Sequence, residues 1–230
     1  MDDGIGFERG SDLLHRHIRD TARPAEFTLF DREWELLDGV FSPTYTPVTS
    51  LFTSWLPFPD GGSFLEIGSG TGVTAVVAAQ EHCGAVTALD LSAAAVENTR
   101  RNVVRHGVED RVRVLQSDLF AALGADERFD LIYWNSNFAE PPEGFVNETD
   151  LHHAFFDPGY DAHRRFLRQA PDRLTPGGRA LLGFSSIGNV RLLRQLATEA
   201  GGELTLLRSQ SRDLGTVVIE FQMWELTRRA

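Results

Sequence analysis

The pattern of hydrophobic and polar positions changes near residue 60. From residue 63 onward, short apolar runs of strand length alternate with longer amphipathic segments of helix length. The predicted strands are 63–67, 85–89, 112–116, 129–134, 179–184, 203–208 and 217–226, and the predicted helices are 73–82, 93–106, 160–174 and 190–200, with a weak helical turn at 121–123. Strands separated by helices form parallel sheets with right-handed crossovers. The last two strands lack an intervening helix, so the pattern predicts an α/β fold with a seven-stranded, mainly parallel sheet, one antiparallel strand at or near its edge, and helices on both faces.

The first 60 residues follow a different pattern. Residues 1–25 are polar, and Ser11 is a candidate N-cap for a short helix from Asp12 to about Asp20. Residues 26–60 are rich in aromatic residues and proline, which makes them too apolar for a free tail. We therefore expect two regions: an extension, 1–60, that packs on the mouth of a ligand site, and a ligand-binding domain, 61–230.

Three glycines alternate between the first predicted strand of that domain and the helix after it: Gly68, Gly70 and Gly72. Glycine allows positive φ and a close approach of the backbone to a ligand. The N-terminus of the following helix offers free N–H groups and the positive end of a dipole. A purely structural turn would explain such a motif about as often as a ligand site would, so other residues must decide between the two.

Polar residues follow the next three predicted strands at the point where each strand ends. Asp90 ends the second strand, Asp118 follows the third, and Asn135 follows the fourth. Each alone fits an Asx turn or a helix cap. In an open α/β sheet, however, ligands bind at the carboxyl ends of the strands. We therefore expect one ligand edge, where Asp90 accepts hydrogen bonds from ribose hydroxyls and Asp118 lies near an adenine amino group.

The spacing of the glycines distinguishes between two adenosine cofactors. A dinucleotide site has Gly-x-Gly-x-x-Gly, whereas position 73 is Val and the third glycine comes at 72. Segments 64–72, 129–135 and 174–178 resemble motifs of the class I, Rossmann-like methyltransferases, which bind S-adenosylmethionine (SAM) and release S-adenosylhomocysteine. The resemblance implies a SAM site and argues against NAD. The implied cofactor-binding residues are Glu66, Gly68, Ser69, Gly70, Thr71, Gly72, Asp90, Leu91, Asp118, Leu119 and Asn135.

Within that class, the chain most resembles the glutamine N5-methyltransferases of release factors and their relatives. Those enzymes carry Asn-Pro-Pro-Tyr after the fourth strand, where this chain has Asn135-Ser136-Asn137-Phe138. The resemblance implies catalytic roles for Asn135, Asn137 and Phe138 in transfer of a methyl group by direct displacement to an amide or amine nitrogen of a small molecule or peptide. Both prolines are missing, which removes rigidity from the motif and leaves the identity of the acceptor open.

Two other functions remain open on the sequence alone. His152 and His153 lie in the aromatic stretch after the motif, and a histidine base would favour O-methylation. A non-catalytic SAM-binding subunit is the other alternative, although the glycine loop and the strand-end acid are intact. We expect no metal site: His15 and His17 are two residues apart on a predicted helix, so their rings diverge.

Composition narrows the range of partners. The chain has 33 acidic and 22 basic side chains and a formal net charge of −11. Affinity for nucleic acid depends on Lys and Arg that neutralise phosphates, so we expect no nucleic-acid partner. The start of the chain lacks the basic and apolar regions of a secretory signal, and no uncharged apolar run reaches the roughly 18 residues of a membrane span. We expect a cytoplasmic location and no membrane association. The sequence indicates no oligomeric state.

Overall fold

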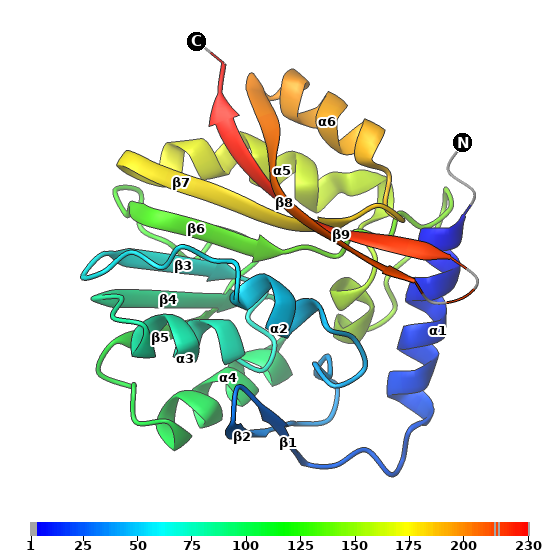
Figure 1. Cartoon of the computed structure of the whole chain (residues 1–230), viewed down its shortest axis with the longest axis horizontal. Helices are drawn as coiled ribbons and strands as arrows, with labels where there is room; N and C mark the ends of the chain where they lie inside the picture. Colours follow the sequence, from blue (N-terminus) through cyan, green and yellow to red (C-terminus); the bar gives the residue numbers. More distant parts are fainter. Residues whose placement is uncertain (1–3, 214, 216, 230) are drawn as a thin grey trace.

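A computed structural model describes residues 4–213, 215 and 217–229. Its main sheet has seven strands in the order β5-β4-β3-β6-β7-β9-β8 (Figure 1). The strands are β3 (Ser63–Ile67), β4 (Ala85–Asp90), β5 (Val112–Gln116), β6 (Phe129–Asn135), β7 (Leu174–Ser185), β8 (Gly202–Asp213) and β9 (Val218–Arg228). Strands β3 to β7 pair in parallel, and β9 runs antiparallel to both β7 and β8. The predicted fold class, with its single antiparallel strand, is confirmed.

Helices cover both faces of this sheet because successive strand residues point to opposite sides. On β6, Leu131 and Tyr133 belong to one apolar cluster, whereas Ile132 and Trp134 belong to the other. The first cluster includes side chains of α2 (Val48–Thr53), α3 (Val73–Gln80) and α4 (Ala93–Arg105), and the second includes side chains of α5 (Asp161–Gln169) and α6 (Val190–Glu199). Two cores therefore hold β6, and its carboxyl end, firmly in place.

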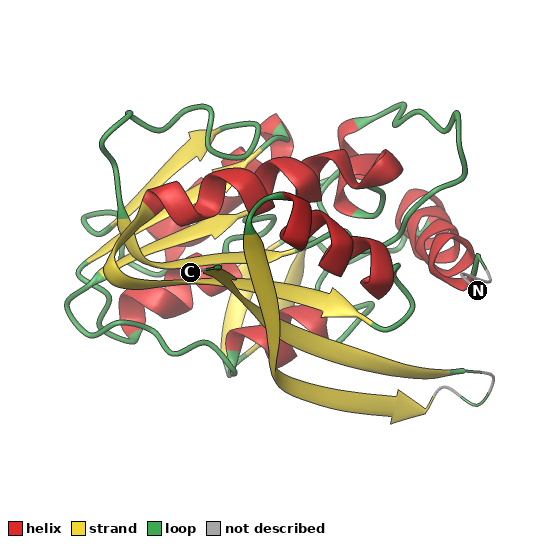
Figure 2. Cartoon of the chain, turned by 90° about the horizontal axis from the view of Figure 1, so that it is seen from above, coloured by secondary structure: helices red, strands yellow, loops and turns green. Residues whose placement is uncertain are grey.

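Some predicted elements have different bounds in the structure. Residues 117–128 form turns, so the helical turn expected at 121–123 is absent. Helix α5 ends at Gln169 and is followed by a 3-10 helix, Ala170–Arg173, that contains Pro171. Strands β8 and β9 are longer than expected and form a long hairpin that projects from the sheet (Figure 2). Among the described residues, no helix is both long enough and apolar enough to cross a lipid bilayer.

The aromatic residues before β3 belong to the core of the domain. A short antiparallel pair, β1 (Glu26–Leu29) and β2 (Arg32–Glu35), places the buried side chains of Phe27 and Trp34 in the same apolar cluster as Phe64 of β3. Two asparagines of α4 hold this segment: Asn98 donates to the carbonyl of Glu35, and Asn102 donates to the same carbonyl. Residues 26–60 are thus packed on the sheet domain along one continuous core.

Helix α1 (Ile5–Arg19) begins earlier than the sequence indicated, so Ser11 lies inside the helix and the prediction that it caps the helix is wrong. The helix lies beyond the carboxyl end of β6 (Figure 1). Two glycines bring its backbone close to the domain. A Cβ atom would lie 2.3 Å from the carbonyl oxygen of Ile187 at Gly6, and 2.8 Å from the Phe156 ring at Gly10. A side chain at either position would push α1 away.

A buried histidine fastens the other end of α1. The Nδ1 atom of His17 donates to the Leu13 carbonyl at 2.7 Å, and its Nε2 atom accepts from the Ser42 N–H at 2.8 Å. The ring also packs against Phe41, Tyr45 and Phe155. Protonation of Nε2 would break the bond to Ser42. Burial, helped by the nearby cations Arg23 and Arg16, lowers the pKa of His17 to about 4, although the hydrogen bond to Leu13 opposes the shift.

We expect this histidine to make the protein acid-sensitive. In the unfolded chain His17 binds a proton below about pH 6.5, whereas in the folded protein it does so only near pH 4. The free energy of unfolding should therefore fall as the pH drops from about 6.5 to 4. Denaturant unfolding across this range should show a smaller pH slope in His17→Gln than in the wild type. The exposed His15 provides the control: His15→Gln should keep the wild-type slope, and equal slopes in all three proteins would contradict the prediction.

Candidate active site

A cavity of about 920 Å³ lies at the carboxyl edge of the sheet. Its walls come from the ends of β3, β4 and β6, from the cavity-facing side of α1, and from the loop 139–158. This volume lies within the range of small-molecule sites. All the residues that the sequence assigned to cofactor binding or catalysis line it except Gly72. A Cβ at Gly72 would lie 2.8 Å from Thr99 of α4, so this glycine serves helix packing.

The glycine loop is anchored to the end of β4. The carboxylate of Asp90 accepts from the Gly70 N–H at 2.8 Å and from the Ser92 N–H at 2.9 Å. Thr99 of α4 donates to the Gly70 carbonyl at 3.0 Å. Gly68 and Gly70 both have positive φ, of 68° and 55°. Burial raises the pKa of Asp90, although its backbone hydrogen bonds oppose the shift. Asp90 and the glycine loop are therefore held together by hydrogen bonds, and both line the cavity.

Glu66 contributes a second carboxyl group to this end of the cavity. Its side chain is 3% exposed, and burial raises its pKa to about 8, while hydrogen bonds from Thr74 and the Ala75 N–H lower the pKa. Within the described part of the chain, the Oε2 atom has no hydrogen-bond partner. A buried carboxyl with a spare acceptor is costly unless a ligand satisfies it. SAM carries an ammonium group and two ribose hydroxyls, so the oxygens of Glu66 and Asp90 fit its hydrogen-bond donors.

The third strand-end acid has a partner that the sequence did not reveal. Asp118 is half-exposed and pairs with Arg165 of α5 at 2.7 Å. Arg165 also lies 3.7 Å from Asp161 on its own helix. Asp118 and Leu119 still line the cavity. The charge expected to face an adenine amino group is therefore shared with a cation that comes from 47 residues further along the chain.

Hydrogen bonds hold the Asn135–Phe138 segment where the related motif has prolines. The N–H and Oγ of Ser136 both donate to the Gly183 carbonyl, at 3.1 and 2.8 Å. The Nδ2 atom of Asn137 donates to the carbonyls of His153 and Phe156, at 3.0 and 2.9 Å. Because two carbonyls fix the nitrogen of this amide, its Oδ1 points the other way. Among the described residues that oxygen has no partner.

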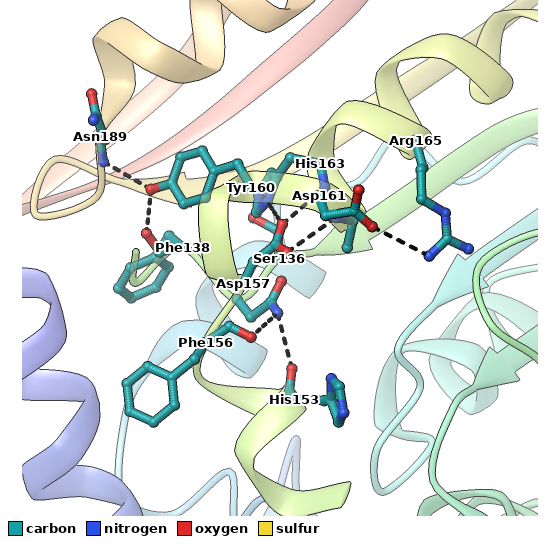
Figure 3. A network of polar contacts seen from close by, with 12 residues as sticks. Ser136, Phe138, His153, Phe156, Asp157, Tyr160, Asp161, His163, Arg165 and Asn189 are labelled. Atoms are coloured by element: carbon teal, nitrogen blue, oxygen red, sulfur yellow. Dashed lines mark hydrogen bonds and ion pairs between the residues drawn. The ribbon is translucent and has the colours of Figure 1, made fainter. Parts of the chain in front are cut away.

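Phe138 is positioned through its backbone. Its carbonyl accepts from the Tyr160 hydroxyl at 2.5 Å, and that hydroxyl accepts from the Asn189 N–H at 2.8 Å (Figure 3). The Phe138 ring packs edge-on against Phe184 of β7. These contacts join the end of the motif to the starts of α5 and α6.

The two candidate histidine bases have different positions. His153 lines the cavity, is exposed, and its Nδ1 lies 3.0 Å from Nδ2 of Asn147. His152 does not line the cavity, and its Nδ1 lies 2.7 Å from the Thr149 hydroxyl. Only His153 is therefore placed to meet an acceptor. Within the described residues, no group of three or more His, Cys, Asp or Glu side chains is arranged to hold a metal ion.

Asp157 and His163 form a buried acid–histidine pair that the sequence did not predict. The carboxylate of Asp157 accepts from the N–H groups of Ala162 and His163, and one of its oxygens lies 2.6 Å from Nδ1 of His163 (Figure 3). The His163 ring lies between Trp134 and Tyr160. The pair fastens the loop 139–158 to α5. The only sequence signal for it is the spacing of an acid six residues before a histidine, which is too weak to predict a contact.

Comparison with known proteins identifies relatives of this chain. The family model of the methyltransferase small domain matches residues 34–196. The chain is 38% identical over 157 residues to a ribosomal protein uL3 glutamine methyltransferase of Bradyrhizobium diazoefficiens, which covers 65% of this chain and 47% of that protein. It is 34% identical over 167 residues to a release factor glutamine methyltransferase of Bordetella pertussis, with coverages of 62% and 60%. The chain spans about half the length of the curated relatives it matches.

Solved structures share the fold. A ribosomal protein L11 methylase from Lactobacillus delbrueckii subsp. bulgaricus superposes with a TM-score of 0.59 at 16% identity and covers 93% of each chain. A SAM-dependent methyltransferase from Thiobacillus denitrificans, in complex with S-adenosylhomocysteine, gives a TM-score of 0.52 at 14% identity, with 80% of this chain and 91% of that chain covered. The family match, the fold and the cavity agree: the chain belongs to the methyltransferase small domain family.

Proposed function

We propose that the protein methylates the nitrogen of a primary carboxamide. The observation that carries this proposal is the oriented amide of Asn137, whose nitrogen is occupied by two carbonyls and whose oxygen lacks a partner among the described residues. Asn135, two residues earlier, lines the same cavity from the end of β6. Two relatives named as glutamine methyltransferases support a carboxamide as the acceptor group.

The side-chain oxygens of Asn135 and Asn137 would orient the amide group of the substrate. A primary amide presents two N–H donors in a plane, and the side-chain oxygens of Asn135 and Asn137 can only accept. Both bonds together would fix that plane and aim the nitrogen toward the cofactor end of the cavity. When bound, SAM would supply a methyl group activated by its sulfonium. The aligned nitrogen would bond to this methyl carbon as the C–S bond breaks, with S-adenosylhomocysteine as the leaving group and one N–H proton released to solvent. Alignment of this kind is worth about 7–11 kcal/mol in favourable cases, so a rigid pair of acceptors is a substantial contribution.

The apolar wall would exclude water from this nitrogen. Phe138, Phe145 and Phe156 line the cavity around Asn137. Phe145 packs edge-on against Phe156 with ring centroids 5.1 Å apart. An apolar surface lowers the local dielectric constant and so strengthens the hydrogen bonds that the asparagine oxygens accept. It also leaves fewer water molecules to compete for them.

Product analysis on matched acceptors tests the proposal. The protein is incubated with SAM and short peptides that differ only in one residue, Gln, Asn, Glu or Ser, and the methylated atom is located by tandem mass spectrometry. We expect a methyl group on the side-chain nitrogen of an amide peptide and none on the Glu or Ser peptide. Methyl transfer to the Ser hydroxyl or the Glu carboxylate, without transfer to an amide, would instead support O-methylation with His153 as the base.

A further inference from the structure

Three charged residues of α1 line the cavity, Arg9, Asp12 and Arg16, and the last two, of opposite charge, do not pair with each other. Asp12 and Arg16 both line the cavity and are both exposed. They are four residues apart on the helix, the spacing at which an acid and a base ordinarily form an ion pair. Among the described residues, no hydrogen bond or ion pair joins either of these side chains to a protein group of opposite charge. Each charge is therefore available to a ligand.

An aromatic ring holds Arg16 in this position. The Arg16 guanidinium lies over the ring of Tyr45, 4.1 Å from its centroid. The Tyr45 hydroxyl donates to the Asp20 carboxylate at 2.5 Å, and the ring lies edge-on to His17, 4.6 Å away. A stacked guanidinium keeps its N–H edge free for a carboxylate while its face is occupied. Asp20, the other acid one turn from Arg16, is already bonded to Tyr45 and to the Ala22 N–H.

One side chain connects α1 to the asparagine pair. The Phe156 ring lies against Gly10, where a Cβ would be 2.8 Å from Cε1. The carbonyl of the same Phe156 accepts from Asn137 at 2.9 Å. The two charges are therefore on the helix that packs directly on the residue holding the amide acceptor. The two charges and the two asparagines line the same cavity.

We propose that the acceptor is a free α-amino acid with a side-chain amide, and that Arg16 binds its carboxylate and Asp12 its ammonium group. This inference rests on the proposed function and adds the substrate class. A zwitterion matches one cation and one anion that lie a helical turn apart. A glutamine within a polypeptide carries neither charge on its backbone, and a nucleic acid has no cation for Asp12.

The test compares acceptors that each lack one charge. L-Glutamine and L-asparagine are assayed beside the N-acetyl derivative, which lacks the ammonium group, and the methyl ester, which lacks the carboxylate. We expect the better free amino acid to exceed each derivative by about 10- to 100-fold in kcat/KM, because charge-assisted hydrogen bonds are the stronger class. Arg16→Gln should abolish only the preference for the acid over the ester. Asp12→Asn should abolish only the preference for the free amine.

Matched control variants and a binding measurement distinguish failure of the zwitterion site from failure of the proposed amide methylation. Glu8 and Arg19 are exposed on the same helix and do not line the cavity, so Glu8→Gln and Arg19→Gln should keep both preferences. Equal rates for the free amino acid, its derivatives and a glutamine peptide would overturn this inference and leave the amide proposal intact. If no amide is methylated, the proposed function fails. Titration of L-glutamine into the protein with S-adenosylhomocysteine would then decide separately, since equal binding by wild type and Arg16→Gln, or no binding, would overturn the zwitterion site.

Discussion

Asn135→Ala should lower kcat for methyl transfer to an amide by about 100- to 1000-fold, the effect of removing a preorganised hydrogen-bonding group from an active site. Asn135 is the last residue of β6, and its backbone is in register with Gly183 of β7. Truncation of the side chain should therefore leave the strand in place and remove only an acceptor for the substrate N–H. The Kd for SAM should change by less than about tenfold, although Asn135 is also one of the implied cofactor-binding residues, because Asp90, Glu66 and the glycine loop remain.

The neighbouring serine supplies the matched control. Ser136 is buried, and its hydroxyl donates to the Gly183 carbonyl, so this side chain ties the segment to β7. Ser136→Ala should lower kcat by less than about tenfold, with a measurable loss of stability of about 1 kcal/mol. Steady-state kinetics and calorimetric titration with SAM on both variants give the comparison. Wild-type kcat with normal SAM affinity in Asn135→Ala would refute the role assigned to this side chain.

The motif around Asn135 shows what a sequence conveys about rigidity. The absence of two prolines suggested a loose acceptor site. In the structure, bonds from Ser136 to Gly183, 47 residues away, and from Asn137 to Phe156, 19 residues away, restrain the same segment. Proline rigidity is local and visible in sequence, whereas a hydrogen bond to a distant carbonyl depends on the completed fold.

The same distinction separates the elements that could be predicted from those that could not. Short apolar runs located the parallel strands, because a strand that helices cover on both faces is apolar at successive positions. The start of α1 was missed because Gly6 and Gly10 argue against a helix by propensity. Their value lies in contacts with Ile187 and Phe156, far along the chain.

Charged partners were harder to foresee than the ligand edge itself. Asp90 and Asp118 were both expected at the cavity because they end consecutive strands, and both line it. The pairing of Asp118 with Arg165 could not be predicted, since nothing in a helix sequence indicates which strand end it will face. Because only Asp118 shares its charge with an arginine, we expect Asp90 and Asp118 to contribute differently to the affinity for SAM.

Asp90→Ala should raise the Kd for SAM by about 100-fold. Its carboxylate is the group that joins the glycine loop to the end of β4, through the N–H groups of Gly70 and Ser92. Removal leaves both donors without their partner and takes away the acceptor expected to bind the ribose hydroxyls. Each lost charge-assisted bond is worth about 1.5–3 kcal/mol, and about 2.7 kcal/mol corresponds to 100-fold in affinity.

Asp118→Ala should raise the same Kd by no more than about tenfold. Its carboxylate is half-exposed and already shared with Arg165, so solvent and the ion pair weaken whatever it contributes to the cofactor. Calorimetric titration of both variants with SAM and with S-adenosylhomocysteine measures the difference, and Asp90→Asn separates charge from hydrogen bonding because it keeps one acceptor oxygen. A larger loss in Asp118→Ala than in Asp90→Ala would mean that adenine recognition, and not the anchoring of the loop, dominates cofactor affinity.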